Sequence, residues 1–402
     1  MTELGDIIRQ EISVCGPISF ARFMELALYE PTFGYYERQA KQIGCQGDFY
    51  TSVSTGPVFG ELLAFQFADW LQELGSRVTS PHSTADEVPA APHSPAHSLE
   101  SHFQIVEAGA HDGRLAHDIL SWMNTHRTAF PQQIEYVIVE PSPARQGMQR
   151  KMLSKFTCQI RWVPALDKIP ATSVTGVIFG NELLDAMPVH RIGWNSRENC
   201  WFEWRVTFVD GGFRWVRMEA SSEAKSSAST YHDPTLPTEL TSVLPDGFTT
   251  EVCPSASTWW KRAAQKLQNG KLLALDYGLT HYEFFNPSRS NGTLRAYGHH
   301  HVLSNVLDDP GAVDITAHVN FTAVENAGVS AGLVTIFSDS QAGFLTGIFK
   351  RTIDDPDRFT PWTPDRLRQF KTLTHPEHLG RSFKVLAQAT HQYSDRRISS
   401  GG

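Results

Sequence analysis

Apolar residues recur with helical spacing near the start of the chain, and this spacing predicts two amphipathic helices. The first is expected over residues 17–30, and Pro31 is expected to end it. Its apolar face holds Phe20, Phe23, Met24 and Ala27. The second follows a polar loop, and its apolar face holds Phe59, Leu62, Leu63, Phe67, Trp70, Leu71 and Leu74. Both helices are therefore expected to pack on a core.

From residue 102 onward, short apolar runs alternate with helical segments such as residues 114–124. Such runs are typical of buried strands. They cover residues 102–109, 134–140, 159–163, 176–180, 271–276 and 383–388. Apolar strands that alternate with helices indicate a parallel sheet with helices on both faces. The predicted fold class is therefore α/β, with a Rossmann-like sheet.

Residues 189–218 break this alternation. Apolar and polar residues alternate there, and Asp210-Gly211 is a hairpin signal, so an antiparallel insertion is predicted. Residues 76–101 are rich in Ser, Pro, Ala and His without periodicity, which favours a flexible insertion over a metal site. The chain is thus expected to divide into an N-terminal helical region with a site-covering loop (1–75), the flexible insertion (76–101), a first core part (102–188), a β-rich and helical insertion on the substrate side (189–260) and a second core part (261–402).

The composition is that of a globular protein with an acidic balance. The 35 Lys and Arg residues face 43 Asp and Glu residues, a formal charge of -8, which argues against a general nucleic-acid binder. Five scattered cysteines without a C-x-x-C pair favour reduced thiols over a disulfide frame or a zinc site. No apolar run reaches about 18 residues, and the start has no signal or transit character. We therefore expect a cytoplasmic, bacterial protein without a membrane span.

The first candidate for chemistry is the turn after the strand at 102–109. In an open α/β sheet, ligands bind at the carboxyl ends of the strands, and Gly109 lets the backbone approach a ligand. A dinucleotide site would need G-x-G-x-x-G, but His111 and Arg114 stand where that pattern needs glycine. S-adenosylmethionine (SAM) has no pyrophosphate. Glu107 could bind its ammonium group, and Glu140, which ends the next strand, its ribose hydroxyls. SAM is therefore favoured over a nicotinamide cofactor or a turn without a ligand.

The second candidate is the stretch Asn181–His190, which follows the strand at 176–180 and lies at the same sheet edge. Glu182 and Asp185 can converge if this turn begins a helix. Carboxylates bind a guanidinium group in a planar, bidentate way and can orient its nitrogen toward a methyl donor. The alternatives are that Asp185 caps a helix and that His190 is structural rather than a proton acceptor or relay.

Two further motifs are read as structural. Gly328-x-Ser330-x-Gly332 fits the hydrolase nucleophile elbow, but a helix precedes it and a strand follows, which is the reverse of the required order. A helix end that leads into a strand is therefore predicted. The histidines at 299–301 are adjacent and have no spaced Cys or acidic partner, so a loop is favoured over a metal site.

Longer motifs resemble the MidA-type SAM-dependent methyltransferases, whose mitochondrial members help to assemble respiratory complex I. They start at Gly16-Pro-Ile-Ser-Phe20, Tyr29-Glu-Pro-Thr-Phe-Gly-Tyr-Tyr36, Gly47-Asp-Phe-Tyr-Thr-Ser52, Phe59-Gly-Glu-Leu-Leu63 and Val139-Glu-Pro-Ser142. They continue with Asn181-Glu-Leu-Leu-Asp-Ala-Met-Pro-Val-His190, Leu275-Asp-Tyr-Gly278, Gly292-Thr-Leu-Arg-Ala-Tyr297 and Pro310-Gly-Ala-Val-Asp-Ile-Thr-Ala-His-Val319. The resemblance implies a class I methyltransferase sheet, SAM as cofactor and, in the mitochondrial members, dimethylation of an arginine in a complex I subunit.

The site expected from both lines of reasoning has three parts. The cofactor-binding residues are Glu107, Gly109, His111, Gly113, Glu140 and Asn181. The catalytic residues are Glu182, Asp185 and His190. The site-covering loop contributes Asp48, Thr51 and Ser52. The expected partner is a protein that presents an arginine, and a homodimer is compatible with the sequence.

Two positions depart from the family pattern. His111 stands where relatives usually have the middle glycine of the turn, and Asn320 stands where they tend to have an acid. If the imidazole at 111 fills the cofactor site, only a non-catalytic assembly protein with the same fold remains. That protein class is the alternative function, and a dehydrogenase is a more distant one.

Overall fold

The computed structural model describes residues 2–41, 51–78, 103–126, 134–218, 242–298, 301–303 and 305–391. Its helices are α1 (Glu3–Cys15), α2 (Phe20–Tyr29), α3 (Tyr35–Lys41), α4 (Val58–Val78), α5 (Arg114–Thr125), α6 (Pro143–Met152), α7 (Pro254–Lys266), α8 (His281–Phe284), α9 (Phe321–Ser330), α10 (Gln341–Asp354), α11 (Pro364–Thr374) and α12 (Leu379–Ser382). The predicted insertion at 76–101 and the histidines at 299–301 lie largely outside the described residues.

The main sheet follows the order β15-β16-β10-β5-β2-β3-β4. Its strands are β2 (Phe103–Ala108), β3 (Ile134–Val139), β4 (Ile160–Val163), β5 (Val174–Asn181), β10 (Leu267–Leu279), β15 (Leu333–Ser340) and β16 (Phe383–Thr390). Only β16 runs antiparallel to its neighbours, and the short β14 (Val319–Asn320) adds to the end of β10. The predicted mostly parallel α/β sheet is confirmed.

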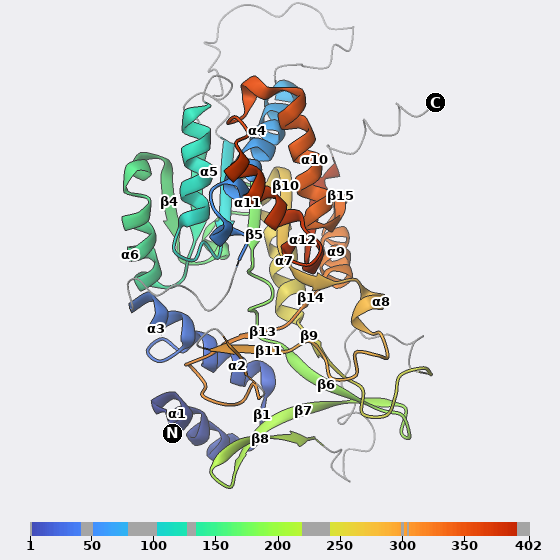
Figure 1. The fold of residues 1–402 in the computed structure, drawn as a ribbon. Coiled ribbons are helices and arrows are strands. Elements are labelled where there is room, and N and C mark those ends of the chain that lie inside the picture. Colours follow the sequence, from blue (N-terminus) through green and yellow to red (C-terminus); the bar gives the residue numbers. More distant parts are fainter. Residues whose placement is uncertain are drawn as a thin grey trace, which may run out of the picture.

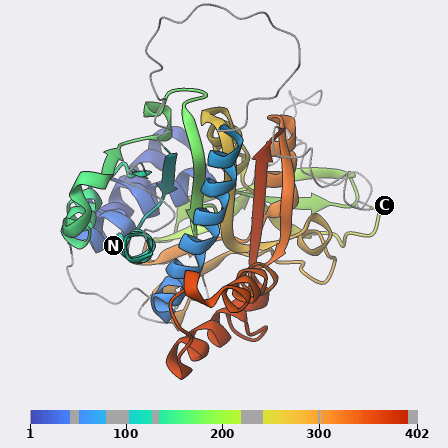
Figure 2. The same cartoon turned by 90° about the horizontal axis from the view of Figure 1, so that it is seen from above.

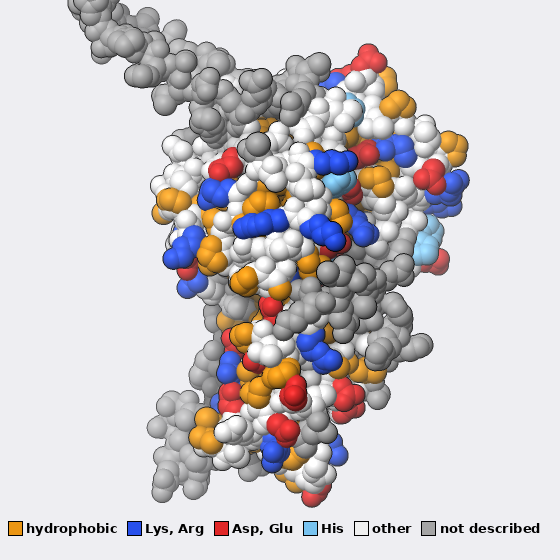
Figure 3. Space-filling view, turned by 90° about the vertical axis from the view of Figure 1, so that its left-hand side faces the viewer, with side chains coloured by type: hydrophobic (Ala, Val, Ile, Leu, Met, Phe, Trp, Pro, Cys, Tyr) orange, Lys and Arg blue, Asp and Glu red, His pale blue; other side chains and the backbone are white. Residues whose placement is uncertain are grey.

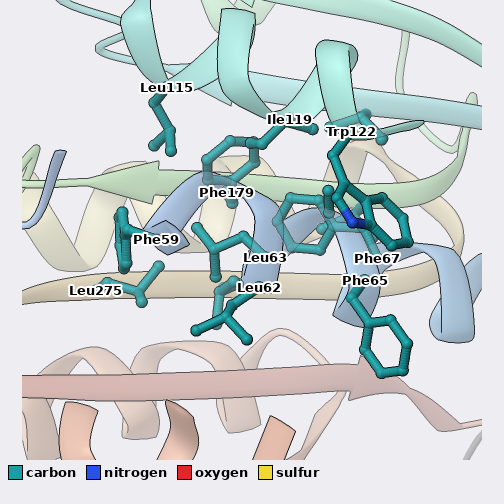
Figure 4. Close-up of a cluster of buried hydrophobic side chains, with 14 of the residues drawn as sticks. Phe59, Leu62, Leu63, Phe65, Phe67, Leu115, Ile119, Trp122, Phe179 and Leu275 are labelled. Carbon is teal, nitrogen blue, oxygen red and sulfur yellow. The ribbon is translucent and has the colours of Figure 1, made fainter. Parts of the chain in front are cut away.

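Two apolar layers cover this sheet. One joins α4, α5 and α10 to one face, and Figure 4 shows its side chains, among them Phe59, Phe67 and Phe179, packed between α4, α5 and the strands. The other joins α7 and α9 to the opposite face, with Trp260 fully buried. Figure 2 shows the helices on both sides of the strands. The apolar runs of β2, β3 and β5 are therefore buried on two sides, as their sequences predict.

A second lobe lies beyond one end of the main sheet (Figure 1). It contains α1, α2 and the strands β1 (Ile18–Ser19), β6 (His190–Asn195), β7 (Cys200–Val209), β8 (Gly212–Arg217) and β9 (Thr249–Val252). The predicted antiparallel insertion is present, and β7 turns into β8 at Asp210-Gly211, where both residues have positive φ. The smaller sheet β12-β11-β13 comprises β11 (Arg295–Gly298), β12 (His301–Val302) and β13 (Asp314–Thr316).

Several predicted boundaries move for local reasons. The helix predicted over 17–30 begins at Phe20, because Ser19 caps it by accepting a hydrogen bond from the Arg22 amide, and it ends at Tyr29, before Pro31. Residues 328–332 lie where α9 ends and β15 begins, so the order that contradicts a nucleophile elbow is confirmed.

A stretch of this acidic chain is basic. Residues 143–166, from the start of α6 past the end of β4, contain Arg145, Arg150, Lys151, Lys155 and Arg161 but no Asp or Glu. Figure 3 shows Lys and Arg side chains on the upper half of the face toward which α6 lies in Figure 1.

In the part of the chain that is described, no helix combines the length and apolar character needed to cross a bilayer.

Candidate functional site

The turn between β2 and α5 has the conformation that its glycines predict. Gly109 and Gly113 have φ values of 75° and 87°, in the region that side chains disfavour. The Gly113 amide donates to the Ala110 carbonyl at 2.7 Å, and α5 begins at the next residue. A Cβ at Gly109 would approach the Leu183 Cδ1 to 2.9 Å. This turn therefore lies against the residues that follow β5, as the sequence predicts.

His111 occupies the middle of this turn with a φ of 47°. A left-handed backbone favours glycine, which explains why a glycine would suit this position. The imidazole is 58% exposed and lies 3.9 Å from the Asp112 carboxylate. Burial opposes ionisation of Asp112, but the nearby His111 side chain and a hydrogen bond of 3.0 Å from the Arg114 amide lower its pKa to about 2. In this structure the His111 side chain therefore lies beside Asp112 and faces solvent.

Glu107 lies inside the sheet rather than at its edge. Its carboxylate is 2% exposed and accepts a hydrogen bond of 2.7 Å from the Tyr136 hydroxyl on β3. Burial raises the pKa of Glu107 to about 8, although the bond from Tyr136 lowers it.

Glu140 follows β3 and is also buried. One carboxylate oxygen accepts from the Ser142 amide at 3.0 Å and the other from the Gln149 side chain at 3.1 Å. Burial raises the pKa of Glu140, which these two hydrogen bonds and Arg145 lower. Glu140 lies at the carboxyl end of β3, and each of its oxygens retains a further acceptor site. Its ribose-binding role stays a prediction.

The residues after β5 form an irregular turn, not a helix. The prediction that Glu182 and Asp185 converge on a helical turn is wrong, and so is the alternative that Asp185 caps a helix. Glu182 has a left-handed backbone, with a φ of 49°. The two carboxyl groups still interact: burial, then the charge of Asp185, raises the pKa of Glu182 to about 8.

Asp276, at the end of the apolar part of β10, organises this turn. Its Oδ2 accepts hydrogen bonds from the amides of Leu183, Leu184 and Asp185 at 3.1, 2.8 and 3.3 Å. Burial raises the pKa of Asp276 to about 7, while the Leu184 amide lowers it. Its functional role was not predicted from the sequence, although Asp276 ends an apolar strand at the same sheet edge as Asn181.

A fourth acid reaches the cluster from β13. Asp314 accepts a hydrogen bond of 3.1 Å from the Tyr36 hydroxyl, and its charge helps to raise the pKa of Asp185, after burial and Asp276. We call Glu182, Asp185, Asp276 and Asp314 the acidic cluster. The rings of Tyr29 and Tyr36 lie 5.4 Å apart, and the Tyr29 hydroxyl donates to the Ala186 carbonyl in the same turn.

Three acids of the cluster, Glu182, Asp185 and Asp276, have few compensating charges. Among the residues that the structure describes, no Lys or Arg side chain forms an ion pair with Glu182, Asp185 or Asp276. Nor do three His, Cys, Asp or Glu side chains in the described ranges come together as metal ligands would. The arrangement can therefore take up an organic cation that donates several hydrogen bonds.

Helix α3 connects the two halves of the site. Tyr36 bonds to Asp314, and its ring lies 4.7 Å below the Arg145 guanidinium of α6. The next residue, Glu37, accepts a hydrogen bond of 2.9 Å from the Ser142 hydroxyl beside Glu140. Neither residue was predicted to belong to the site, because nothing in the local sequence shows that α3 contacts segments more than 100 positions away.

The covering loop is only partly described. Asp48 lies outside the described residues. The Ser52 amide donates to the Glu182 carboxylate and so lowers its pKa, and the Ser52 hydroxyl donates to Gln341 at 3.1 Å. Thr51 bonds to Ser54 within the loop. The structure therefore brings Ser52 to Glu182, whereas Thr51 supports the loop.

His190 lies at the start of β6 and contacts Glu203. Its Nδ1 is 2.7 Å from the Glu203 carboxylate, which Arg205 also binds at 2.8 Å. Its proposed part in proton transfer stays a prediction.

A model of the S-adenosyl-L-methionine-dependent methyltransferase family matches residues 62–337, which is more than half of the chain. The chain belongs to this family. Its cofactor is therefore SAM, and the resemblance to the MidA-type methyltransferases is confirmed.

Named relatives and a solved structure agree with this family assignment. The chain is 26% identical to the Drosophila melanogaster mitochondrial protein arginine methyltransferase NDUFAF7 homolog, over 96% of this chain and 84% of the relative. It is also 26% identical to human mitochondrial protein arginine methyltransferase NDUFAF7, over 95% of this chain and 82% of that protein. A Burkholderia thailandensis protein solved with bound S-adenosyl-homocysteine is 28% identical, with a TM-score of 0.74 over 96% of this chain and 91% of that one.

The residues at the carboxyl ends of β2, β3 and β5 fit this cofactor. The Gly109 turn lies so close to Leu183 that a Cβ at residue 109 would contact the Leu183 side chain. Glu140 offers free acceptor positions for hydroxyl groups. The side-chain oxygen of Asn181 is buried without a hydrogen-bond partner among the described residues, so it can accept from an ammonium group. Glu107 fits less well, because its carboxylate already faces Tyr136 within the sheet.

Proposed function

We propose that this protein transfers a methyl group from SAM to an arginine side chain of a partner protein, and that Glu182 binds the guanidinium group. The observation that carries the proposal is the buried acidic cluster beside the Gly109 turn. A guanidinium group has five N–H donors and a fixed positive charge, which match an array of carboxylate acceptors. The names of the mitochondrial relatives support arginine as the acceptor.

The acids must hold the guanidinium in line with the methyl donor. Bound SAM supplies an electrophilic methyl group on its sulfonium. Glu182 would orient one edge of the guanidinium, and Asp185 would support it from the same turn. Because Ser52 and Asn181 each donate to Glu182, the carboxylate is held in one orientation. Positioning of this kind supplies much of the rate in a transfer between two bound groups.

A proton has to leave as the new carbon–nitrogen bond forms, because the methylated guanidinium keeps a single positive charge. We assign this proton to a carboxylate oxygen of Glu182. Its raised pKa makes it a better base than an exposed carboxylate. The tyrosines around the cluster, Tyr29 and Tyr36, would border the cation with aromatic faces, which attract guanidinium groups.

The division into regions at residues 75, 101, 188 and 260 stays a prediction, as do a homodimer and a cytoplasmic location. The NDUFAF7 relatives are named as mitochondrial proteins. The covering role of residues 48–52 is supported by Ser52, whose amide donates to the Glu182 carboxylate.

Labelled methyl transfer tests the proposal. The protein would be incubated with methyl-labelled SAM and an extract of the source organism, and mass spectrometry would locate labelled residues. We expect label on arginine, reduced about 100-fold or more by Glu182→Gln, because that change removes the charge that positions the guanidinium. Binding of S-adenosyl-homocysteine without label on any arginine would contradict arginine methylation and support the non-catalytic alternative.

A further inference from the structure

The backbone of Glu182 is in a conformation that glycine would adopt more easily. Its φ is 49°, and a non-glycine residue in the left-handed region is strained. The preceding residue ends β5, and the Glu182 amide still donates to the Leu275 carbonyl of β10 at 2.9 Å. The chain therefore bends at the residue whose side chain has to reach the acceptor. Such strain persists only where neighbouring interactions hold it.

Asp276 supplies the interactions that hold the residues after this bend. One carboxylate oxygen collects the three successive amides of residues 183–185, and the other accepts from the Tyr277 amide at 2.8 Å. The side chain is 1% exposed. Its acceptor capacity is therefore used by the backbone rather than by solvent or by a ligand.

The same turn is fixed from two other directions. The Asp185 carbonyl accepts from the Ala317 amide at 3.0 Å, and the Ala186 carbonyl accepts from the Tyr29 hydroxyl at 2.8 Å. These contacts hold carbonyl groups, whereas Asp276 holds the amides. Loss of Asp276 would thus leave three amides next to Glu182 without their acceptor.

We propose that Asp276 is a positioning residue, which holds the strained turn so that Glu182 points its carboxylate at the acceptor guanidinium. This inference rests on the proposed function. Asp276 does not touch the substrate. It acts through the backbone of residues 183–185 and through its charge, which lies close to Glu182 and Asp185.

The variant Asp276→Asn tests this role, because an amide keeps the shape but loses the charge and one acceptor. We expect S-adenosyl-homocysteine affinity within about twofold of wild type and a kcat/KM for arginine methylation at least tenfold lower, mainly through kcat. We also expect the midpoint of the kcat/KM–pH profile to fall, since a negative charge beside Glu182 is removed. The other titratable groups facing Asp276 are Asp185, Tyr277 and Cys253, and Asp314 acts on Asp185.

The matched control is Glu251→Gln. Glu251 is also buried and accepts hydrogen bonds from the Thr293 amide and hydroxyl, but it lies on β9, and these hydrogen bonds do not reach the amides of residues 183–185. We expect it to lower the Tm without moving the pH midpoint. An Asp276→Asn enzyme with unchanged kcat/KM and midpoint would overturn the inference, while a wild-type enzyme that methylates no arginine would overturn the proposed function instead.

A measurement on the wild-type protein covers the case in which Asp276→Asn does not fold. The amide NMR signals of residues 183–185 report on the hydrogen bonds to Asp276. With S-adenosyl-homocysteine bound, addition of N-acetyl-arginine amide should shift these signals. Saturation of the protein with that compound and no shift in the three amides would overturn the inference.

Discussion

Tyr136 on β3 donates a hydrogen bond of 2.7 Å to Glu107 on β2, and both side chains are buried. Tyr136→Phe would remove the donor and leave a buried carboxyl oxygen without its partner. We expect the free energy of unfolding to fall by about 1–3 kcal/mol. Urea denaturation measures this. Tyr282→Phe is the control, because Tyr282 is 74% exposed and its change should have no measurable effect. Equal effects of the two changes would contradict the importance of this hydrogen bond.

The raised pKa of Glu107 predicts a pH dependence of stability. Its pKa is about 8 in the folded protein and about 4.3 in an unfolded chain, so the folded state binds more protons between these values. The contribution of Glu107 is therefore fully present below about pH 4.3 and is lost as the pH rises through 8. Glu107→Gln should make the fall in stability from pH 5 to pH 8 shallower, as measured by denaturation at several pH values. An unchanged slope would show that Glu107 ionises freely.

The parallel core could be predicted because its strands are buried on both faces and read as continuous apolar runs. The β7–β8 hairpin could be predicted because Asp210-Gly211 requires positive φ. The turn after β5 could not be predicted. Its amides donate to Asp276, more than 90 residues away, instead of forming helical hydrogen bonds. The interaction of Asp314 with Asp185 could not be predicted either, because it depends on how the second lobe packs against the main sheet.

The Glu182 carboxyl predicts the pH dependence of the reaction. The kcat/KM reports ionisation in the free enzyme, and a cationic guanidinium binds the ionised carboxylate. Because the pKa of Glu182 is about 8, kcat/KM for an arginine acceptor should rise with pH to a plateau above 8. Initial rates from pH 6 to pH 9.5 would test this. A profile that falls as the pH rises from 6 to 8 would contradict the assigned role of Glu182.

Gly109 offers a test of the cofactor turn with a closely matched control. Gly109 and Gly211 have φ values of 75° and 77°, so alanine at either should cost about 1–2 kcal/mol of backbone strain. The new Cβ at residue 109 would contact Leu183, whereas a Cβ at residue 211 would have no atom within 4 Å. We expect Gly109→Ala to weaken S-adenosyl-homocysteine binding at least tenfold and Gly211→Ala to leave it unchanged, by calorimetry. Equal affinities of the two variants for S-adenosyl-homocysteine would show that the Gly109 turn is not part of the cofactor site.

The most direct test is a crystal structure of the protein with S-adenosyl-homocysteine and an arginine-containing peptide from the labelled acceptor. We expect the sulfur above the Gly109 turn and the guanidinium bonded to Glu182, with one of its nitrogens facing the sulfur. A guanidinium bound away from Glu182, or the His111 imidazole filling the cofactor position, would contradict arginine methylation at this site.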